Sequence, residues 1–216
     1  AGMDRSRLFL VSKVMPSHFR RDDLLRAVED SLRRLGTDSL DLYLLHRTVP
    51  PEIDPRETFE ALDALVARGL TRAIGVSNFG AESRRRAQAL ANHPIVVNQV
   101  HYNLRIREPE TSGLLAYCQE HDVLLEAWRP LMGIRTADVP AVLRRVCETY
   151  DKTPSQVALR WLLQQRNVVT LARMRSPEHL EENLGALDWE MRGEDVALLR
   201  AEYPDRQAVS DAVPLS

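Results

Sequence analysis

Short, nearly continuous apolar runs alternate along this chain with longer segments in which apolar residues recur every three or four positions. Such runs are typical of strands buried on both faces of a parallel sheet, and the longer segments are typical of amphipathic helices. The six predicted strands are LFLVSKV (8–14), LDLYLLH (40–46), RAIGVSN (72–78), IVVNQVH (95–101), VLLEAW (123–128) and VVTLA (168–172). One strand and one helix in roughly every 25 to 45 residues predict a parallel α/β fold.

Glycine, proline and small polar residues mark the ends of the predicted helices. Glycine closes a helix in the left-handed conformation, whereas Ser, Thr or Asp before a helix caps its free N–H groups. The signals are Gly36 after the helix at 22–35, Asp54-Pro55 with Glu57 as a capping box before the helix that ends at Gly69, and the helix starts at Thr153 and Ser176. The chain has no low-complexity linker, so residues 1–216 are predicted to form one domain.

The composition argues against several classes of protein. The 29 basic and 31 acidic residues give a net charge of -2, which argues against a dedicated nucleic-acid surface. No apolar run approaches the roughly 18 residues of a membrane span, and the first residues, AGMDRSR, show no secretion signal. Cys118 and Cys147 have no metal-binding spacing and are expected to be reduced, buried thiols in helices. We therefore expect a cytoplasmic protein without a metal site, a membrane or a nucleic-acid partner.

Two architectures fit the alternation, the doubly wound sheet and the (β/α)₈ barrel. The G-x-G-x-x-G turn of dinucleotide-binding doubly wound sheets is absent, and this absence favours the barrel. In a barrel the chemistry lies at the carboxyl ends of the strands. The residues at these ends are Lys13, His46, Ser77-Asn78, Asn98-Gln99, Trp128-Arg129 and Arg173.

Each of these polar residues has an ordinary structural explanation when it is considered alone. A histidine that ends an apolar strand is more often a packed core residue, and a lysine there usually extends its ammonium toward solvent. Six such strand ends in succession are harder to explain in this way and indicate a site. Lys13 strengthens the interpretation, because it and Lys152 are the only lysines among the 29 basic residues.

Seven segments of the chain resemble the bacterial aldo-keto reductases, in the order in which that family has them. The segments are LFLVSKV, SLRRLGTDSLDLYLLH, ALVARGLTRAIGVSNFG, VVNQVHYNL, WRPL, TPSQVALRWLL and SPEHLEENLGALDWEM. The resemblance implies a (β/α)₈ barrel that transfers hydride from a nicotinamide dinucleotide to a small carbonyl substrate. The expected cofactor is NADPH, with NADH as the alternative.

The resemblance also implies roles for individual residues. Lys13 matches the catalytic lysine of the family, whose ammonium lowers the pKa of the tyrosine acid, and His46 matches the histidine that donates a hydrogen bond to the carbonyl and orients it. The matches to its cofactor-binding positions are Ser77, Asn78 and Gln99 for the nicotinamide carboxamide, Trp128 for the stacked ring, Arg129 and Leu131 in the following turn, Arg173, Met174 and His179 near the phosphates, and Glu182 and Asn183 for the adenine.

The chain departs from the family at the catalytic centre. The family's catalytic aspartate and tyrosine precede its third strand, and this chain starts just before that strand. About six βα units are therefore expected, in an incomplete barrel. Tyr43 cannot easily replace the acid, because it points to the opposite face of the strand from His46, and Tyr102 is a weak candidate. Arg47 stands where the family commonly has tryptophan after the histidine.

Three explanations of these departures are open. The chain is part of a longer reductase that has about 50 to 60 further N-terminal residues, or it is a short paralogue that binds cofactor or serves as a scaffold without catalysing a reaction. The third explanation is an unrelated barrel enzyme in which Lys13 forms a Schiff base. A six-strand remnant exposes two unpaired barrel edges, so we expect the chain either to dimerise through them or to be poorly soluble alone.

Overall fold

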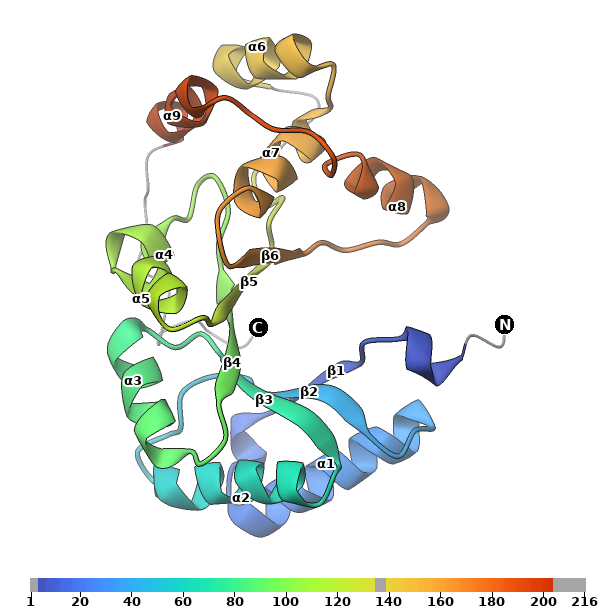
Figure 1. The fold of residues 1–216 in the computed structure, drawn as a ribbon, viewed down its shortest axis with the longest axis vertical. Helices are drawn as coiled ribbons and strands as arrows, with labels where there is room; N and C mark the ends of the chain where they lie inside the picture. Colours follow the sequence, from blue (N-terminus) through green and yellow to red (C-terminus); the bar gives the residue numbers. More distant parts are fainter. Residues whose placement is uncertain (1–3, 135–138, 204–216) are drawn as a thin grey trace. The chain divides into compact units, whose positions relative to one another are not determined.

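The structure, a computed structural model, describes residues 4–134 and 139–203 (Figure 1). Strands and helices alternate along these residues, and the paired strands run parallel, which confirms the predicted α/β class. The chain divides into two compact units, of which the first ends at Gln99 and the second begins at Val100. The prediction of one domain over residues 1–216 stays a prediction.

The first unit contains four strands in the order β1-β2-β3-β4. Their bounds are β1 (Val11–Val14), β2 (Leu40–Leu45), β3 (Thr71–Ser77) and β4 (Ile95–His101), the last of which crosses into the second unit. The helices between them are α1 (Arg21–Leu35), α2 (Pro55–Ala67) and α3 (Ala81–Leu90). Two short 3₁₀ helices, η1 (Arg5–Arg7) and η2 (Pro16–His18), flank β1.

The second unit contains the parallel pair β5 (Leu124–Trp128) and β6 (Val168–Leu171) together with six helices in its described residues. The helices are α4 (Glu108–Thr111), α5 (Leu114–Glu120), α6 (Ala141–Tyr150), α7 (Pro154–Leu163), α8 (Pro177–Leu184) and α9 (Gly193–Glu202). Strand β5 follows α5 and leads through a long connection to α6 and α7, so the strand–helix alternation predicted for this region is confirmed.

All six predicted strands are present, and only β1 differs from its predicted range by more than one residue. It begins at Val11 instead of Leu8. The N–H group of Leu10 donates to the Asp41 carboxylate (2.8 Å), and the Arg5 guanidinium binds the same oxygen (2.9 Å). The Asp41 carboxylate thus binds the residues before β1 through their N–H and guanidinium groups. The Phe9 side chain in this segment is 72% exposed. Self-association through this exposed edge stays a prediction.

The two faces of the first sheet bury different side chains. Tyr43, Leu45, Ile74 and Val76 pack in one cluster with apolar residues of α1, α2 and α3. The opposite face carries a smaller cluster of three buried residues, Leu42, Leu44 and Val97. The alternation along β2 therefore places Tyr43 and Leu45 on the helix-covered face, and Leu42 and Leu44 lie on the other face.

Most of the predicted helix ends are confirmed. Gly36 closes α1 with a φ of 64°, and Asp54 caps α2 by accepting the N–H of Arg56. The expected capping box at Glu57 is wrong, because its carboxylate accepts the N–H of Arg21 at the start of α1 (2.8 Å). Glu57 thus links two helices instead of closing its own first turn. The capping box of α7, between Thr153 and Gln156, is present as predicted.

A buried carboxylate fixes the connection between α3 and β4. Asp63 of α2 accepts the backbone N–H groups of Asn92 (2.8 Å) and His93 (2.9 Å), and their side chains approach the same carboxylate. Burial opposes ionisation, but these hydrogen bonds hold the pKa of Asp63 below its ordinary value of 3.8. An ionised Asp63 therefore stabilises the folded first unit.

Replacing Asp63 with Asn is expected to lower the free energy of unfolding by about 2 kcal/mol at pH 7, because a charged acceptor of two N–H groups is lost. Since the folded-state pKa is lowered, this stabilisation exists above the pKa of the unfolded chain and is lost as the pH falls through the lower folded-state value. Urea unfolding at pH 7 and below pH 3.8 measures both effects. The control is Asp30→Asn, which removes an exposed ion pair to Arg33 and should change little. If Asp63→Asn lowered the free energy of unfolding equally at both pH values, the stabilising role of ionised Asp63 would be contradicted.

Hydrogen-bonded side chains also tie the helices of the second unit together. The Tyr102 hydroxyl donates to Glu110 (2.5 Å) and contacts Gln165 (2.9 Å), and Tyr102 itself is fully buried. The Tyr150 hydroxyl donates to Asp195 (2.7 Å), linking α6 to α9. These contacts connect elements that are far apart in the sequence, and the Tyr102 ring also packs edge-on against the buried Trp161.

The cysteines agree only in part with the sequence interpretation. Cys118 lies in α5 and is buried, as predicted, and Cys147 lies in α6 but is partly exposed. Both are free thiols. Among the described helices, none has the length and apolar character needed to cross a membrane.

Candidate functional site

Four parallel strands of the first unit end in polar residues that contact one another. The ammonium of Lys13 in β1 donates to the amide oxygen of Gln99 in β4 (2.5 Å). The Ser77 hydroxyl at the end of β3 donates to the Gln99 carbonyl (2.8 Å), and the N–H of Asn78 reaches the same carbonyl (2.8 Å). The Asn78 amide also donates to the His46 carbonyl (3.2 Å). The structure thus brings together all five site residues predicted for this part of the chain.

His46 directly follows the last residue of β2 and is partly buried. Its backbone N–H donates to the Val14 carbonyl (3.0 Å), and its Nδ1 atom lies 2.9 Å from the sulfur of Met15. A thioether sulfur only accepts hydrogen bonds, so this contact favours the tautomer with its proton on Nδ1. Burial, and then the charges of Lys13 and Arg47, lower the pKa of His46, so the imidazole is neutral at pH 7.

Asn98 supports these strand ends from the neighbouring position. Its amide nitrogen donates to the Phe79 carbonyl (2.8 Å), and its amide oxygen lies 3.4 Å from the Phe79 nitrogen. Both polar groups of the Asn98 amide contact the Phe79 backbone, so Asn98 holds the turn after β3 instead of facing a ligand. The sequence places Asn98 beside Gln99 at a strand end, and only the alternation of the strand separates the two roles.

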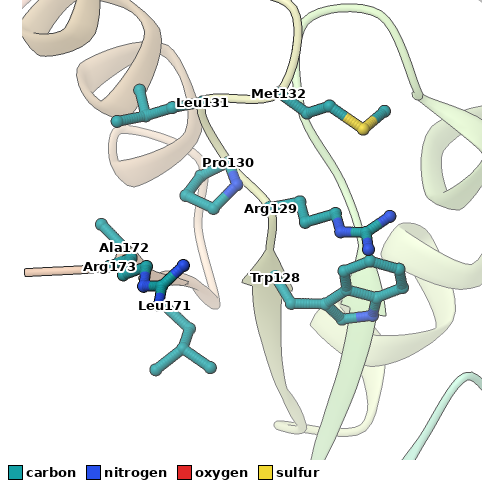
Figure 2. A pocket seen from close by; sticks show the side chains of 8 residues that line it. All are labelled: Trp128, Arg129, Pro130, Leu131, Met132, Leu171, Ala172 and Arg173. Carbon is teal, nitrogen blue, oxygen red and sulfur yellow. The ribbon is translucent and has the colours of Figure 1, made fainter. Parts of the chain in front are cut away.

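In the second unit a cavity of about 760 Å³ lies at the ends of β5 and β6. Figure 2 shows its lining residues, with Trp128 and Arg129 on one side and Leu171, Ala172 and Arg173 on the other. The walls are mostly apolar, and Arg129 and Arg173 each bring a guanidinium group. Leu131 also lines the cavity, so four predicted cofactor-binding residues are brought together here.

The Trp128 ring is held by stacking contacts that the sequence analysis did not predict. His101 stacks on it with ring centroids 4.2 Å apart and planes 18° apart. The Arg129 guanidinium carbon lies 5.1 Å from the Trp128 ring centroid, and Figure 2 shows these two side chains next to each other. His101 is 6% exposed, and burial together with the Arg129 charge lowers its pKa to about 4. Both rings are therefore neutral at pH 7. A signal was available, since His101 ends strand β4 just as Trp128 ends β5.

Arg129 begins the turn after β5 in a strained backbone conformation, with a φ of 53°. The buried Asn103 amide donates to the Arg129 carbonyl (3.1 Å), and the Asn103 oxygen accepts the N–H groups of Arg105 and Ile106. Asn103 thus joins this turn to the loop after β4, a role that no sequence pattern indicated. Left-handed conformations of residues other than glycine are often found at functional sites.

The remaining predicted cofactor residues lie around α8 and do not line the cavity. Met174 is 51% exposed, and the backbone N–H of His179 is used by the Ser176 cap. The Glu182 carboxylate accepts the Thr153 hydroxyl (3.1 Å), which links α8 to the start of α7. Asn183 lies in the same helix and is partly buried. Their roles toward a cofactor stay predictions.

Neither tyrosine that the sequence raised as a replacement acid is accessible. Tyr43 and Tyr102 are both fully buried. Burial raises the pKa of Tyr43 to about 12, and burial together with Glu110 raises the pKa of Tyr102 further above its ordinary value. This geometry agrees with the expectation that neither tyrosine readily replaces the acid. Within the described residues, no group of three or more His, Cys, Asp or Glu side chains could hold a metal ion.

The model of the Aldo/keto reductase family matches residues 2–203. The chain belongs to this family of oxidoreductases. It is 36% identical to the glyoxal reductase of Bacillus subtilis over 207 residues, which cover 96% of the chain and 72% of that protein.

Solved structures of the family agree with the fold. The thermostable aldo-keto reductase Tm1743, in complex with an inhibitor, superposes with a TM-score of 0.86 at 42% identity, over 92% of this chain and 73% of that one. An aldo-keto reductase from Klebsiella pneumoniae in complex with NADPH gives a TM-score of 0.82 at 36% identity, over 94% of this chain and 72% of that one. The barrel-type α/β assignment is thereby confirmed.

Proposed function

We propose that this chain carries the site of an NADPH-dependent reductase that converts small aldehydes or ketones to alcohols. The observation that carries the proposal is the cluster at the strand ends of the first unit, where Lys13, held by Gln99, lies in the same sheet as His46, Ser77 and Asn78. A charged lysine at the carboxyl ends of parallel strands suits a reaction that develops negative charge on oxygen.

The side chains present fit a nicotinamide dinucleotide. The cavity beside Trp128 has apolar walls for a ring and two guanidinium groups for phosphates, which is the donor set that such a cofactor needs. Arg173 suits a 2′-phosphate by its fork geometry, which favours NADPH over NADH. Ser77, Asn78 and Gln99 in the first unit keep the carboxamide role, and Trp128 in the second unit keeps the ring-stacking role, that the family resemblance implies for each of them. When bound, NADPH supplies the hydride.

The residues of the chain act on the carbonyl oxygen. When the carbonyl carbon accepts hydride, the C=O π electron pair moves to the oxygen, which then takes one proton and becomes a hydroxyl. The Lys13 ammonium stabilises that charge and can pass on a proton that solvent replaces. With its proton on Nδ1, His46 presents Nε2 as an acceptor, so Lys13 carries most of this stabilisation. The relative in Bacillus subtilis is a glyoxal reductase, and glyoxal is an example of the small aldehydes that we propose as substrates.

A protein that binds the cofactor without catalysis is the second candidate. The inaccessibility of Tyr43 and Tyr102 favours it, because neither hydroxyl can protonate a bound substrate. Both candidates retain the Trp128 cavity and differ in whether NADPH is consumed. Turnover of NADPH with an aldehyde therefore separates them.

Titrating the chain with NADPH, and then with NADH, is expected to quench tryptophan fluorescence at micromolar concentrations, with the tighter binding for NADPH. Stacking of a nicotinamide ring on Trp128 is the physical cause, so Trp128→Phe should remove most of the quenching. Trp161 and Trp189 do not line the cavity and provide the residual signal. Absence of quenching and of binding by calorimetry would contradict the proposal. Loss of NADPH absorbance with methylglyoxal then decides between the reductase and the binding protein.

A further inference from the structure

Arg47 directly follows His46, at a point of the chain that the first unit holds in place. The His46 N–H donates to the Val14 carbonyl (3.0 Å) and the His46 carbonyl accepts from the Asn78 amide (3.2 Å). These two bonds, to strands on either side of β2, fix the backbone that leads into Arg47. Arg47 is itself partly buried, although a surface arginine usually extends fully into water.

The Arg47 guanidinium has no hydrogen bond or ion pair within residues 4–134 and 139–203. Several other arginines of the first unit are paired with carboxylates, as Arg5 is with Asp41 and Arg68 with Glu29. Withdrawing a cation from water without a counter-charge is unfavourable, so an unpaired, partly buried arginine is suited to an external anion.

The surroundings of His46 are positively charged. Apart from burial, the groups that lower the pKa of His46 are Lys13 and Arg47, and no carboxylate offsets them. One cation is sufficient to stabilise an oxygen that becomes negative. A second cation beside it is needed when the substrate brings a negative charge of its own, because a carboxylate close to the developing charge would otherwise oppose the reaction.

We propose that Arg47 binds a carboxylate of the substrate, and that the substrate class is short oxo acids, in which an aldehyde or ketone and a carboxylate lie a few bonds apart. The short spacing follows from the chain, since Arg47 directly follows His46, which lies near the Lys13 ammonium assigned to the carbonyl oxygen, and consecutive Cα atoms are about 3.8 Å apart. A planar guanidinium matches a carboxylate through two parallel N–H···O bonds. This inference rests on the proposed function, because it assigns the substrate of the same site.

The matched substrates are 4-oxobutanoate and its neutral methyl ester, which differ only in the charged group. With NADPH, the wild-type protein is expected to show a kcat/KM at least 10-fold higher for the acid than for the ester. Arg47→Ala should lower this ratio about 10- to 100-fold, Arg47→Lys should lower it less, and added salt should reduce it in the wild type. The control is Arg56→Ala, which removes an exposed arginine at the start of α2 and should leave the ratio as it is.

The possible failures are distinguishable. The carboxylate assignment is overturned if the ester and the acid have equal kcat/KM values, or if Arg47→Ala lowers kcat/KM equally for the two compounds. The reductase proposal stands in both cases. If neither compound consumes NADPH and methylglyoxal does not either, the proposed function fails and the assignment of Arg47 fails with it.

Discussion

Replacing Lys13 with methionine is expected to lower kcat/KM for aldehyde reduction about 100- to 1,000-fold, the loss seen when a group that stabilises an oxyanion is removed. Lys13 brings a positive charge to the strand ends, and Gln99 holds its ammonium at 2.5 Å. Methionine keeps the length of the side chain and removes the charge. The measurement is NADPH consumption over a range of aldehyde concentrations, together with the midpoint of urea unfolding.

The chain provides a matched control, since its second lysine is Lys152. Lys152 precedes α7 and lies with its ammonium 5.9 Å from the Trp189 ring centroid, in the other unit. Lys152→Met should therefore leave turnover within a few-fold of the wild type. If the two variants lost turnover equally, Lys13 would have no specific role in the reaction. The same conclusion would follow if Lys13→Met lost turnover only in proportion to its loss of stability.

Borohydride trapping on the wild-type protein tests the Schiff-base explanation. If Lys13 attacked a carbonyl carbon, borohydride would trap the imine as a stable amine and add the mass of the substrate to Lys13. Hydride transfer from NADPH leaves no such adduct. We therefore expect no mass change on Lys13 after borohydride treatment with methylglyoxal. A trapped adduct would favour an unrelated barrel enzyme that forms a Schiff base on Lys13.

The sequence was sufficient to predict the strands and the ends that carry polar residues. Continuous apolar runs, helix caps such as Gly36 and the alternation along β2 are local properties, and the structure confirms them. The meeting of Lys13 with Gln99 also follows, because parallel strands bring their carboxyl ends to one edge. The exception is Glu57, whose carboxylate accepts the N–H of Arg21 at the start of α1 instead of capping its own helix.

Other features depend on contacts between residues that are distant in the sequence. His101 and Trp128 stack because two strand ends come together, and Asn103 holds Arg129 through a single buried amide. Neither contact has a pattern of its own, since histidine and asparagine are common in loops. Met174 matches a cofactor position in the sequence, but it does not line the cavity. A motif fixes the order of residues along the chain, whereas a site needs their side chains to converge.

Gly75→Ala is expected to destabilise the first unit by about 3 kcal/mol, near the upper end of the cost of inserting a methyl group into a packed core. Gly75 of β3 pairs with Leu44 of β2 and with Val97 of β4. A Cβ atom there would lie 2.9 Å from the Val97 carbonyl oxygen and would overlap the Leu44 side chain. The Val97 oxygen belongs to the backbone of a paired strand, so it cannot move away as a flexible side chain could.

The control for this substitution is Gly193→Ala at the start of α9, where an added Cβ would meet nothing within 4 Å. Alanine there should leave stability unchanged or raise it slightly, because it restricts the unfolded chain. Urea unfolding of both variants measures the difference, and a Gly75→Ala protein as stable as Gly193→Ala would contradict the packing. The loss should also reach the site, since Leu44 occupies the register position opposite Lys13. A strand that must shift to admit one methyl group moves the lysine on which the proposed chemistry depends.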